Sequence, residues 1–219
     1  INVLIDFTQF LGPWNKGQVL IVLGFFRIMV LPVWGWMYNS FSLLPKKIHD
    51  GSLDMVLSKP IDSQFLVSIS RFGFSVIPSL VVGTGLMFYG FNLLHTTPTL
   101  SSILVCLWLA AISTVVIYGI YFSTVALALY ATRLENIHMI FVHFYDVARY
   151  PKDIFTPLFQ RIFTSLIPIS LIVTVPAQAL FNPLNFSEIV LLHVVAIGFL
   201  FLGRIIWQHG LRRYSSASS

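Results

Sequence analysis

Residues 100–130, LSSILVCLWLAAISTVVIYGIYFSTVALALY, contain no Asp, Glu, Lys or Arg. A helix that crosses the hydrocarbon core of a bilayer needs about 20 mostly apolar residues, and this run is longer than that. Its apolar residues follow one another without alternation, which favours a helix over a strand of a membrane barrel. The stretch therefore predicts a transmembrane helix.

The composition of the whole chain also indicates a membrane protein. Of its 219 residues, 57% are hydrophobic and only 10% are charged, whereas a soluble domain has about 25% charged residues. The basic residues behind the net charge of +5 are scattered, so they do not indicate nucleic-acid binding. The single cysteine, Cys106, excludes a disulfide within the chain. We expect an all-α polytopic membrane protein whose residues 1–219 form one transmembrane domain.

The apolar segments predict a bundle of five spans. Their approximate ranges are 17–44, 65–94, 100–130, 137–150 and 187–207. Pro78 is expected to kink the second span, and the fourth span is the most polar. The chain begins with Ile1 and not with Met, so we expect a further span before it, which would bring the number to six.

A proline-punctuated stretch precedes the last span. It includes Pro168, Pro176 and Pro183 and is too interrupted to cross the membrane as one helix. A re-entrant pair of short helices over about 151–185 fits better, because non-helical backbone is tolerated in the membrane where protein or water surrounds it. Tyr150 precedes Pro151, which predicts the end of the fourth helix at this point.

A charged insert lies between the first two expected spans. It reads KKIHDGSLDMVLSKP over residues 46–60 and contains three Lys and two Asp. Leu53, Val56 and Leu57 form an apolar stripe at helical spacing, while Gly51 and Pro60 are typical of helix ends. These features predict a short helix over about 48–59 that lies along the membrane surface. An ordinary solvated loop is the alternative.

The distribution of Lys and Arg predicts the orientation, because these residues are more frequent on the cytoplasmic side. The side that holds the insert would also hold most of the basic residues: Lys46, Lys47, Lys59, Arg71, Arg133, Arg204, Arg212 and Arg213. The opposite side would hold Lys16, Arg149, Lys152 and Arg161. We therefore expect the insert and the C-terminus to be cytoplasmic.

Three motifs in the same order resemble a bacterial family of ABC-2 type permeases. The first is Ile48-x-x-Gly51-x-Leu53-Asp54-x-x-Leu57-x-Lys59-Pro60, which is similar to the cytoplasmic signature of that family. The second is Tyr150-Pro151-x-x-Ile154-Phe155 with Pro168 and Pro176-Ala177, and the third is Gly210-Leu211-Arg212-Arg213-Tyr214-Ser215-Ser216-Ala217. The resemblance covers the chain from about Gly12 to its end.

The resemblance implies a permease subunit of an ABC exporter in the bacterial inner membrane, surrounded by membrane lipid. It implies no catalytic residue and no cofactor in this chain, since ATP and Mg would bind to a separate ABC ATPase dimer. The chain contains no Gly-x-x-x-x-Gly-Lys-Ser/Thr motif, which agrees with that division of labour. A second permease subunit, identical or paralogous, would complete the transport path.

The resemblance also assigns roles to two sets of residues. The short helix of the insert would be the coupling helix that docks on the ATPase, through Lys47, Asp50, Gly51, Leu53, Asp54, Leu57, Lys59 and Pro60. The re-entrant segment would cap the outer end of the translocation path as a gate, through Tyr150, Pro151, Phe155, Pro168 and Pro176.

Ionisable residues inside the expected spans form another set of candidates, because charge inside a membrane is costly and is kept for a reason. Arg27 lies in the first span, and His138, His143 and Asp146 lie in the fourth. His143 and Asp146 are three residues apart and share a helix face. With His193 they support the alternative function, an intramembrane enzyme or a proton-coupled carrier. The pair has no third ligand, so no metal site is predicted.

Overall fold

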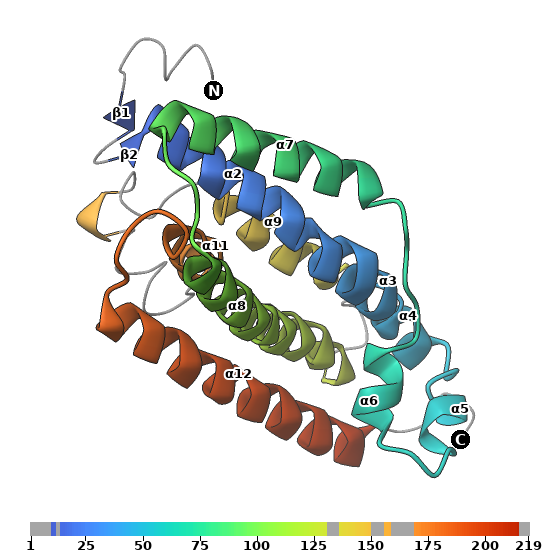
Figure 1. The fold of residues 1–219 in the computed structure, drawn as a ribbon. Helices are drawn as coiled ribbons and strands as arrows, with labels where there is room; N and C mark the ends of the chain where they lie inside the picture. The colour runs from blue at the N-terminus through green and yellow to red at the C-terminus, as the bar shows by residue number, and fades with distance from the viewer. Residues whose placement is uncertain (1–9, 12–13, 131–135, 150–155, 159–168, 215–219) are drawn as a thin grey trace.

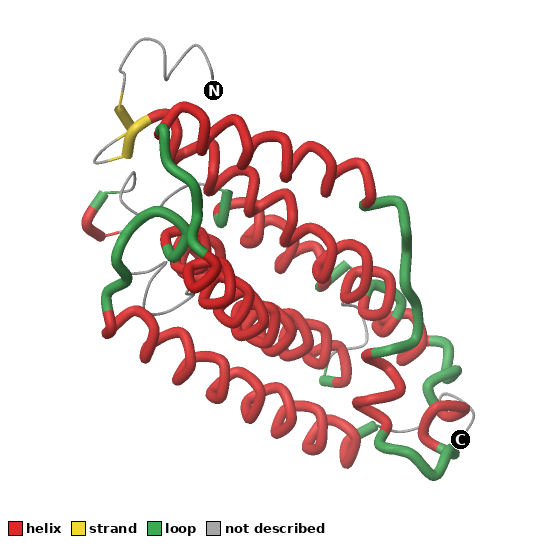
Figure 2. The backbone as a smooth tube through the Cα atoms, viewed as in Figure 1, coloured by secondary structure: helices red, strands yellow, loops and turns green. Residues whose placement is uncertain are grey.

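The computed structural model describes residues 10–11, 14–130, 136–149, 156–158 and 169–214. These residues form a bundle of helices (Figure 1), with a short loop-rich region at one end (Figure 2). Within the described residues, four helical stretches are long and apolar enough to cross a membrane: Lys16–His49, Ile77–Leu94, Leu100–Leu129 and Phe186–Arg213. This supports the predicted all-α polytopic membrane protein.

The first stretch begins at a pair of two-residue strands. Strand β1 (Phe10–Leu11) pairs antiparallel with β2 (Trp14–Asn15). Helix α2 (Lys16–Val30) follows, then a π-helix η1 (Leu31–Met37), α3 (Tyr38–Phe41) and α4 (Leu44–His49). The predicted first span, 17–44, therefore lies within a longer helical stretch.

A capping box sets the beginning of α2. The Gln18 backbone N–H donates to Asn15 Oδ1 over 3.0 Å, and the Asn15 N–H donates to Gln18 Oε1 over 3.1 Å. Both bonds satisfy N–H groups that a helix start leaves without a partner. We expect Asn15→Ala to lower the stability by about 1 kcal/mol, measured by thermal unfolding in detergent. Asn15→Asp, which keeps the acceptor, should stay within about 0.5 kcal/mol of the parent.

The prediction of a second span over 65–94 is wrong for the first half of that range. Residues 65–76 are not part of a continuous helix, because a short helix α6 (Ser63–Ser68) ends there and α7 (Ile77–Leu94) begins only at Ile77. Pro78 lies in the first turn of α7, where proline is tolerated, and it does not kink a longer helix. The third expected span corresponds to the helix α8 (Leu100–Ala126) with a final 3-10 turn, η2 (Leu127–Leu129).

The fourth expected span, 137–150, is shorter than predicted. Helix α9 (His138–Val147) has 10 residues, about 15 Å of helix, or half of the hydrocarbon thickness. The described residues thus provide four helices of span length, where five spans were expected. Helix α11 (Ile169–Gln178) is equally short and contains the buried Pro176. The last described helix, α12 (Phe186–Arg213), is longer than the predicted span, 187–207.

The long helices pack as two pairs, with α7 along α2 and α12 along α8, and α11 between α2 and α8 (Figure 1). Glycines allow the first pair to approach closely. A Cβ atom on Gly83 would lie 2.7 Å from the Gly24 carbonyl oxygen, and one on Gly90 would lie 2.7 Å from that of Gly17. Small residues at such contacts are typical of helix packing in membranes.

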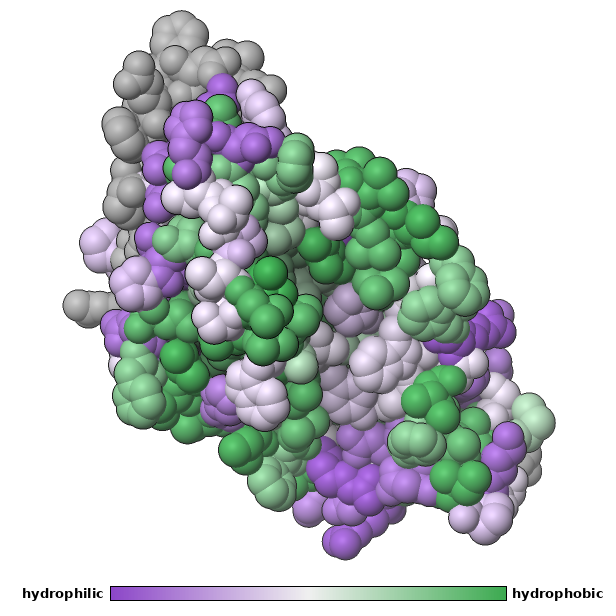
Figure 3. Space-filling view, in the orientation of Figure 1, coloured by the Kyte–Doolittle hydropathy of each residue, from purple (hydrophilic) through white to green (hydrophobic). Residues whose placement is uncertain are grey.

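The outer faces of these pairs are apolar. Large hydrophobic side chains on α7, α8 and α12 are exposed, among them Phe88, Leu104 and Phe201. Hydrophobic residues cover much of the surface over these helices, and hydrophilic residues gather toward the two ends of the bundle (Figure 3). A hydrocarbon environment suits such faces, since a soluble monomer rarely exposes large contiguous apolar patches.

Candidate coupling site

The insert of residues 46–60 is less helical than predicted. Helix α4 ends at His49, Gly51 adopts a left-handed φ of 74°, and the next helix, α5 (Asp54–Leu57), is one turn long. The predicted single helix over 48–59 is thus corrected to a turn followed by α5. Gly51 has the predicted role of ending a helix, because glycine accepts a positive φ without strain.

A local turn holds this arrangement. The Asp50 carboxylate accepts hydrogen bonds from the Ser52 N–H over 3.0 Å and from the Ser52 hydroxyl over 2.6 Å. These bonds lower the pKa of Asp50. The Leu53 N–H then donates to the Lys47 carbonyl over 3.0 Å, which folds the insert back on α4.

The insert has one buried side and one exposed side. Leu53 is fully buried in the core, so it attaches the insert to the bundle and is not free to contact a partner. Met55 is 68% exposed and Leu57 is 36% exposed. Asp50 and Lys59 are also exposed, and Asp54 and Lys47 are half-buried. Of the residues that the resemblance assigned to docking, Leu53 is therefore buried against the bundle, whereas Asp50, Leu57 and Lys59 are exposed.

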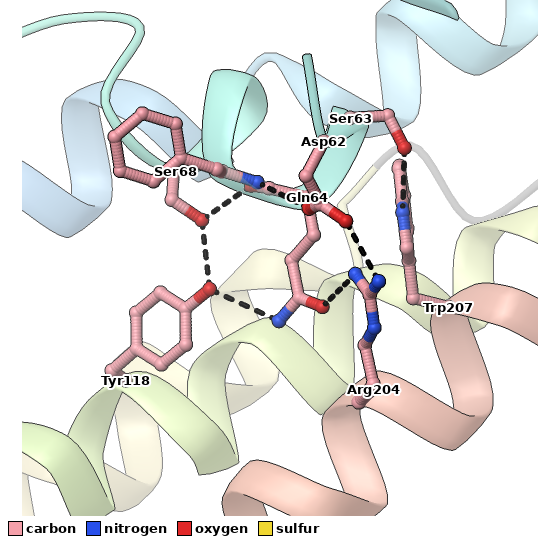
Figure 4. A network of polar contacts seen from close by, with 8 residues as sticks. Asp62, Ser63, Gln64, Ser68, Tyr118, Arg204 and Trp207 are labelled. Atoms are coloured by element: carbon pink, nitrogen blue, oxygen red, sulfur yellow. Dashed lines mark hydrogen bonds and ion pairs between the residues drawn. The ribbon is translucent and has the colours of Figure 1, made fainter.

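A polar network ties the residues after the insert to two long helices (Figure 4). Arg204 on α12 makes an ion pair of 2.7 Å with Asp62 and donates to Gln64 Oε1 over 3.1 Å. Trp207 Nε1 donates to the Ser63 hydroxyl over 3.1 Å. We refer to the network as the clamp, and its members are Asp62, Ser63, Gln64, Ser68, Tyr118, Arg204 and Trp207.

The clamp reaches α8 through a tyrosine. The Tyr118 hydroxyl accepts from Gln64 Nε2 over 3.1 Å and shares a hydrogen bond of 2.8 Å with the Ser68 hydroxyl. Asp62 also accepts from the Phe65 N–H over 3.0 Å as the N-cap of α6. Because Gln64 bonds to both Tyr118 and Arg204, a displacement of α6 acts on α8 and α12 together.

Further hydrogen bonds connect the same segment to the first helical stretch. Trp36 Nε1 donates to the Ser68 carbonyl over 2.6 Å, and the Gly73 N–H donates to the Gly35 carbonyl over 2.7 Å. Trp36 and Gly35 belong to the π-helix η1, whose wider turns release carbonyl groups for such contacts. Residues 63–73 are thus connected by hydrogen bonds to η1, α8 and α12.

The ion pair of the clamp predicts an acid-dependent loss of stability. Hydrogen bonding to Arg204, the largest cause, lowers the pKa of Asp62. A carboxyl group whose pKa is lower in the folded state stabilises the fold at any pH above its unfolded-state pKa, which is about 4 for Asp. This stabilisation is lost as the pH falls through the folded-state pKa. The pair is about half exposed, so we expect at most about 1 kcal/mol. We expect the difference in unfolding free energy between the parent protein and Asp62→Asn to stay constant from pH 5 to 7 and to diminish below about pH 4. Thermal unfolding of both proteins at each pH measures this difference.

The end of α12 lies against the insert. Tyr214 follows α12, and burial of its hydroxyl together with the nearby charges of Asp54 and Asp50 raises the pKa of Tyr214. The first and third motifs of the sequence, which are 150 or more residues apart, therefore meet at one end of the bundle, where α12 ends next to α6 (Figure 1) and Tyr214 lies near Asp54 and Asp50.

Of the intramembrane candidates, Arg27 and Asp146 line one cavity, whereas His138, His143 and His193 are not among its lining residues. His143 is exposed on α9, and Asp146 makes an ion pair with Arg149. His193 on α12 bonds to the Ile189 carbonyl over 2.8 Å and stacks on Trp108 of α8. His138 contacts the ring of Tyr38. Among the described residues no group of three His, Cys, Asp or Glu side chains could hold a metal ion.

Several predicted residues lie outside the described part of the chain, namely Tyr150, Pro151, Phe155 and Pro168. In contrast, the clamp is not predicted from the sequence. Asp62 immediately before Ser63 is a possible N-cap, and Arg204 is a charge inside an otherwise apolar run. Those two signals were available, but neither indicates that the two residues meet.

A family model for ABC-2 family transporter proteins matches residues 1–218, which is nearly the whole chain. The chain belongs to the ABC-2 transporter family. Comparison with curated proteins and with solved structures gives no match. Membership of the ABC-2 family confirms the resemblance stated from the three motifs, and with the four long apolar helices it makes this ABC-2 protein a multi-pass membrane protein.

Proposed function

We propose that this ABC-2 protein is the transmembrane permease subunit of an exporter in the bacterial inner membrane. It moves a substrate with energy from ATP hydrolysis in a separate ATPase dimer, pairs with a second permease subunit, and has no catalytic site or cofactor of its own. The main support for the proposal is the insert. Its one-turn helix α5 is exposed, and the segment that follows it is hydrogen-bonded to three long helical stretches.

The exposed side of the insert has the composition of a docking surface. Met55 and Leu57 are exposed apolar residues at one end of the bundle, and Ile61 and Phe65, which follow the insert, are exposed as well. Asp50 and Lys59 lie near them and are exposed. Apolar anchors surrounded by charged residues are typical of protein interfaces, in which the charges set orientation and specificity more than affinity.

The orientation of the protein follows from the same end of the bundle. The insert and the last turn of α12 lie together there, and their exposed cations include Lys46, Lys59, Arg212 and Arg213. Such an excess of Lys and Arg favours the cytoplasmic side. An ATPase subunit would meet the insert on this side, and the C-terminus would be cytoplasmic.

The clamp provides a mechanical route from the docking surface to the spans. A push on α5 displaces the segment that leads to α6, and Gln64 and Asp62 pass the displacement to Tyr118 on α8 and Arg204 on α12. Leu53 adds a second connection, because it is buried in the core. Packed elements of this kind move as units and not by gradual deformation.

The test is co-purification of the ATPase subunit with the permease from membranes that contain its native neighbours. A buried charge at the centre of an interface costs about 2 kcal/mol or more, so Met55→Glu with Leu57→Glu should lower the recovered ATPase by more than about tenfold. Thr97→Glu, at an exposed turn between α7 and α8, is the control and should leave recovery unchanged. Equal recovery from both variants would contradict the proposed docking surface.

A further inference from the structure

A cavity of about 750 Å³ lies between α2, α7 and the end of α9. Its walls carry two arginines and one aspartate, and the remaining described lining is mostly apolar. The polar lining residues are Arg27, Ser75, Ser79, Asp146 and Arg149. This cavity is separate from the insert and from the clamp.

Arg27 places a positive charge within the first long apolar helical stretch. It lies 11 residues after Lys16, about 16 Å along the helix, and its backbone carbonyl accepts a hydrogen bond from the Ser79 hydroxyl in the first turn of α7 over 3.2 Å. Its side chain is exposed toward the cavity. Among the described residues no ion pair or side-chain hydrogen bond neutralises it, although an unpaired charge within a membrane span is costly.

The second arginine is already neutralised. Arg149 makes an ion pair with Asp146, and its Nε–H donates to the Asp146 carbonyl over 2.8 Å. Its guanidinium lies 5.8 Å from the centre of the Phe26 ring, one residue from Arg27. The described lining therefore has one positive charge in excess, which favours a ligand with one negative charge.

The rest of the lining determines the other part of the ligand. Leu20, Leu23, Val30 and Leu86 provide an apolar wall next to the charged group. A small hydrophilic anion would leave this wall in contact with water, whereas a molecule with an apolar tail covers it. Binding sites commonly combine an apolar lining with a few placed polar groups.

We infer that the cavity binds an amphiphile with a single anionic head group, which Arg27 holds at its phosphate or carboxylate while the tail lies along α2 and α7. The inference does not depend on transport, because the site is complete in the permease without the ATPase. A membrane lipid and a soluble anion share the head-group chemistry, and the experiment separates them by the tail.

The test is native mass spectrometry of the delipidated full chain, without ATPase and without ATP. Phosphatidylglycerol should bind at least about tenfold more tightly than phosphatidylcholine, since one charge-assisted contact is worth about one factor of ten. Glycerophosphoglycerol, which has the singly charged head group without the tail, should not compete. Similar binding of both lipids, or competition by glycerophosphoglycerol alone, overturns the inference.

Variants identify the cavity as the binding site. Arg27→Gln should weaken phosphatidylglycerol binding by about tenfold, and Arg27→Lys should retain most of it. Asp146→Asn should strengthen binding, because it frees Arg149, and a merely damaged fold would not produce that opposite effect. Leu86→Trp should weaken binding by filling the space, while Arg212→Gln, at the far end of α12, should have no effect. Unchanged binding in Arg27→Gln overturns the inference.

Discussion

Replacing Gly83 by valine should separate α7 from α2 and lower the free energy of unfolding by about 3 kcal/mol, the upper end of the usual cost of overpacking. A Cβ atom at this position would lie 2.7 Å from the Gly24 carbonyl oxygen and 2.9 Å from the Cβ of Arg27. A backbone carbonyl cannot move aside as a flexible side chain can. The helices must therefore move apart, and the contacts along both are lost.

Gly85 provides the control on the same helix. A Cβ atom there would have no neighbour within 4 Å, so Gly85→Val changes the helix propensity in the same way without a clash. Thermal unfolding in detergent should show a large loss for Gly83→Val and a small change for Gly85→Val. A loss of similar size in both variants would show that the glycines do not mediate a close contact between α2 and α7.

Replacing Arg204 by methionine should disconnect the insert from the spans while leaving the insert itself intact. The change removes the ion pair to Asp62 and the hydrogen bond to Gln64, but it keeps an unbranched apolar stem in place of the aliphatic part of the arginine. On the proposed function, the ATPase should still co-purify with the permease. Transport that depends on ATP should fall by about tenfold or more, because the loss of about 1.4 kcal/mol of coupling is a factor of ten.

The charges of the clamp allow a rescue experiment. Asp62→Arg alone should impair transport, and its combination with Arg204→Asp should restore part of it by rebuilding the ion pair in reverse. Glu188→Gln removes a charge from the first turn of the same helix, far from the clamp and from the insert, so transport should be preserved. If Arg204→Met transports as well as the parent, α6 does not transmit motion through Arg204.

The boundaries of the long helices could be predicted where local chemistry decides them. Helix α8 begins beside Thr99, whose hydroxyl accepts from the Ser102 N–H over 3.2 Å, and the apolar run that follows has no charge to end it. Residues 65–76 are as apolar as a span but are not one. Hydropathy sums side chains and does not register that the Gly73 N–H finds its partner on Gly35, which depends on the tertiary fold.

In the candidate site too, local features could be predicted from the sequence, whereas contacts between distant residues could not. Gly51 follows the end of α4 with the positive φ that glycine accepts, as predicted, whereas α5 ends at Leu57, before Pro60 is reached. The stripe of Leu53, Val56 and Leu57 predicted an apolar side, but periodicity could not separate the buried Leu53 from the exposed Leu57. The clamp could not be predicted either, since Gln64 and Arg204, which one of its hydrogen bonds joins, are 140 residues apart in the chain.

Site-specific cross-linking tests the central claim, that α5 contacts an ATPase subunit. Cys106 is buried and is the only cysteine of the chain, so Cys106→Ala provides a background in which one introduced cysteine can be followed. Met55→Cys on α5 and Thr97→Cys at the opposite end of the bundle are both exposed positions. The account predicts a cross-link to the ATPase from position 55 and none from position 97. A cross-link from position 97 but none from position 55 would contradict it.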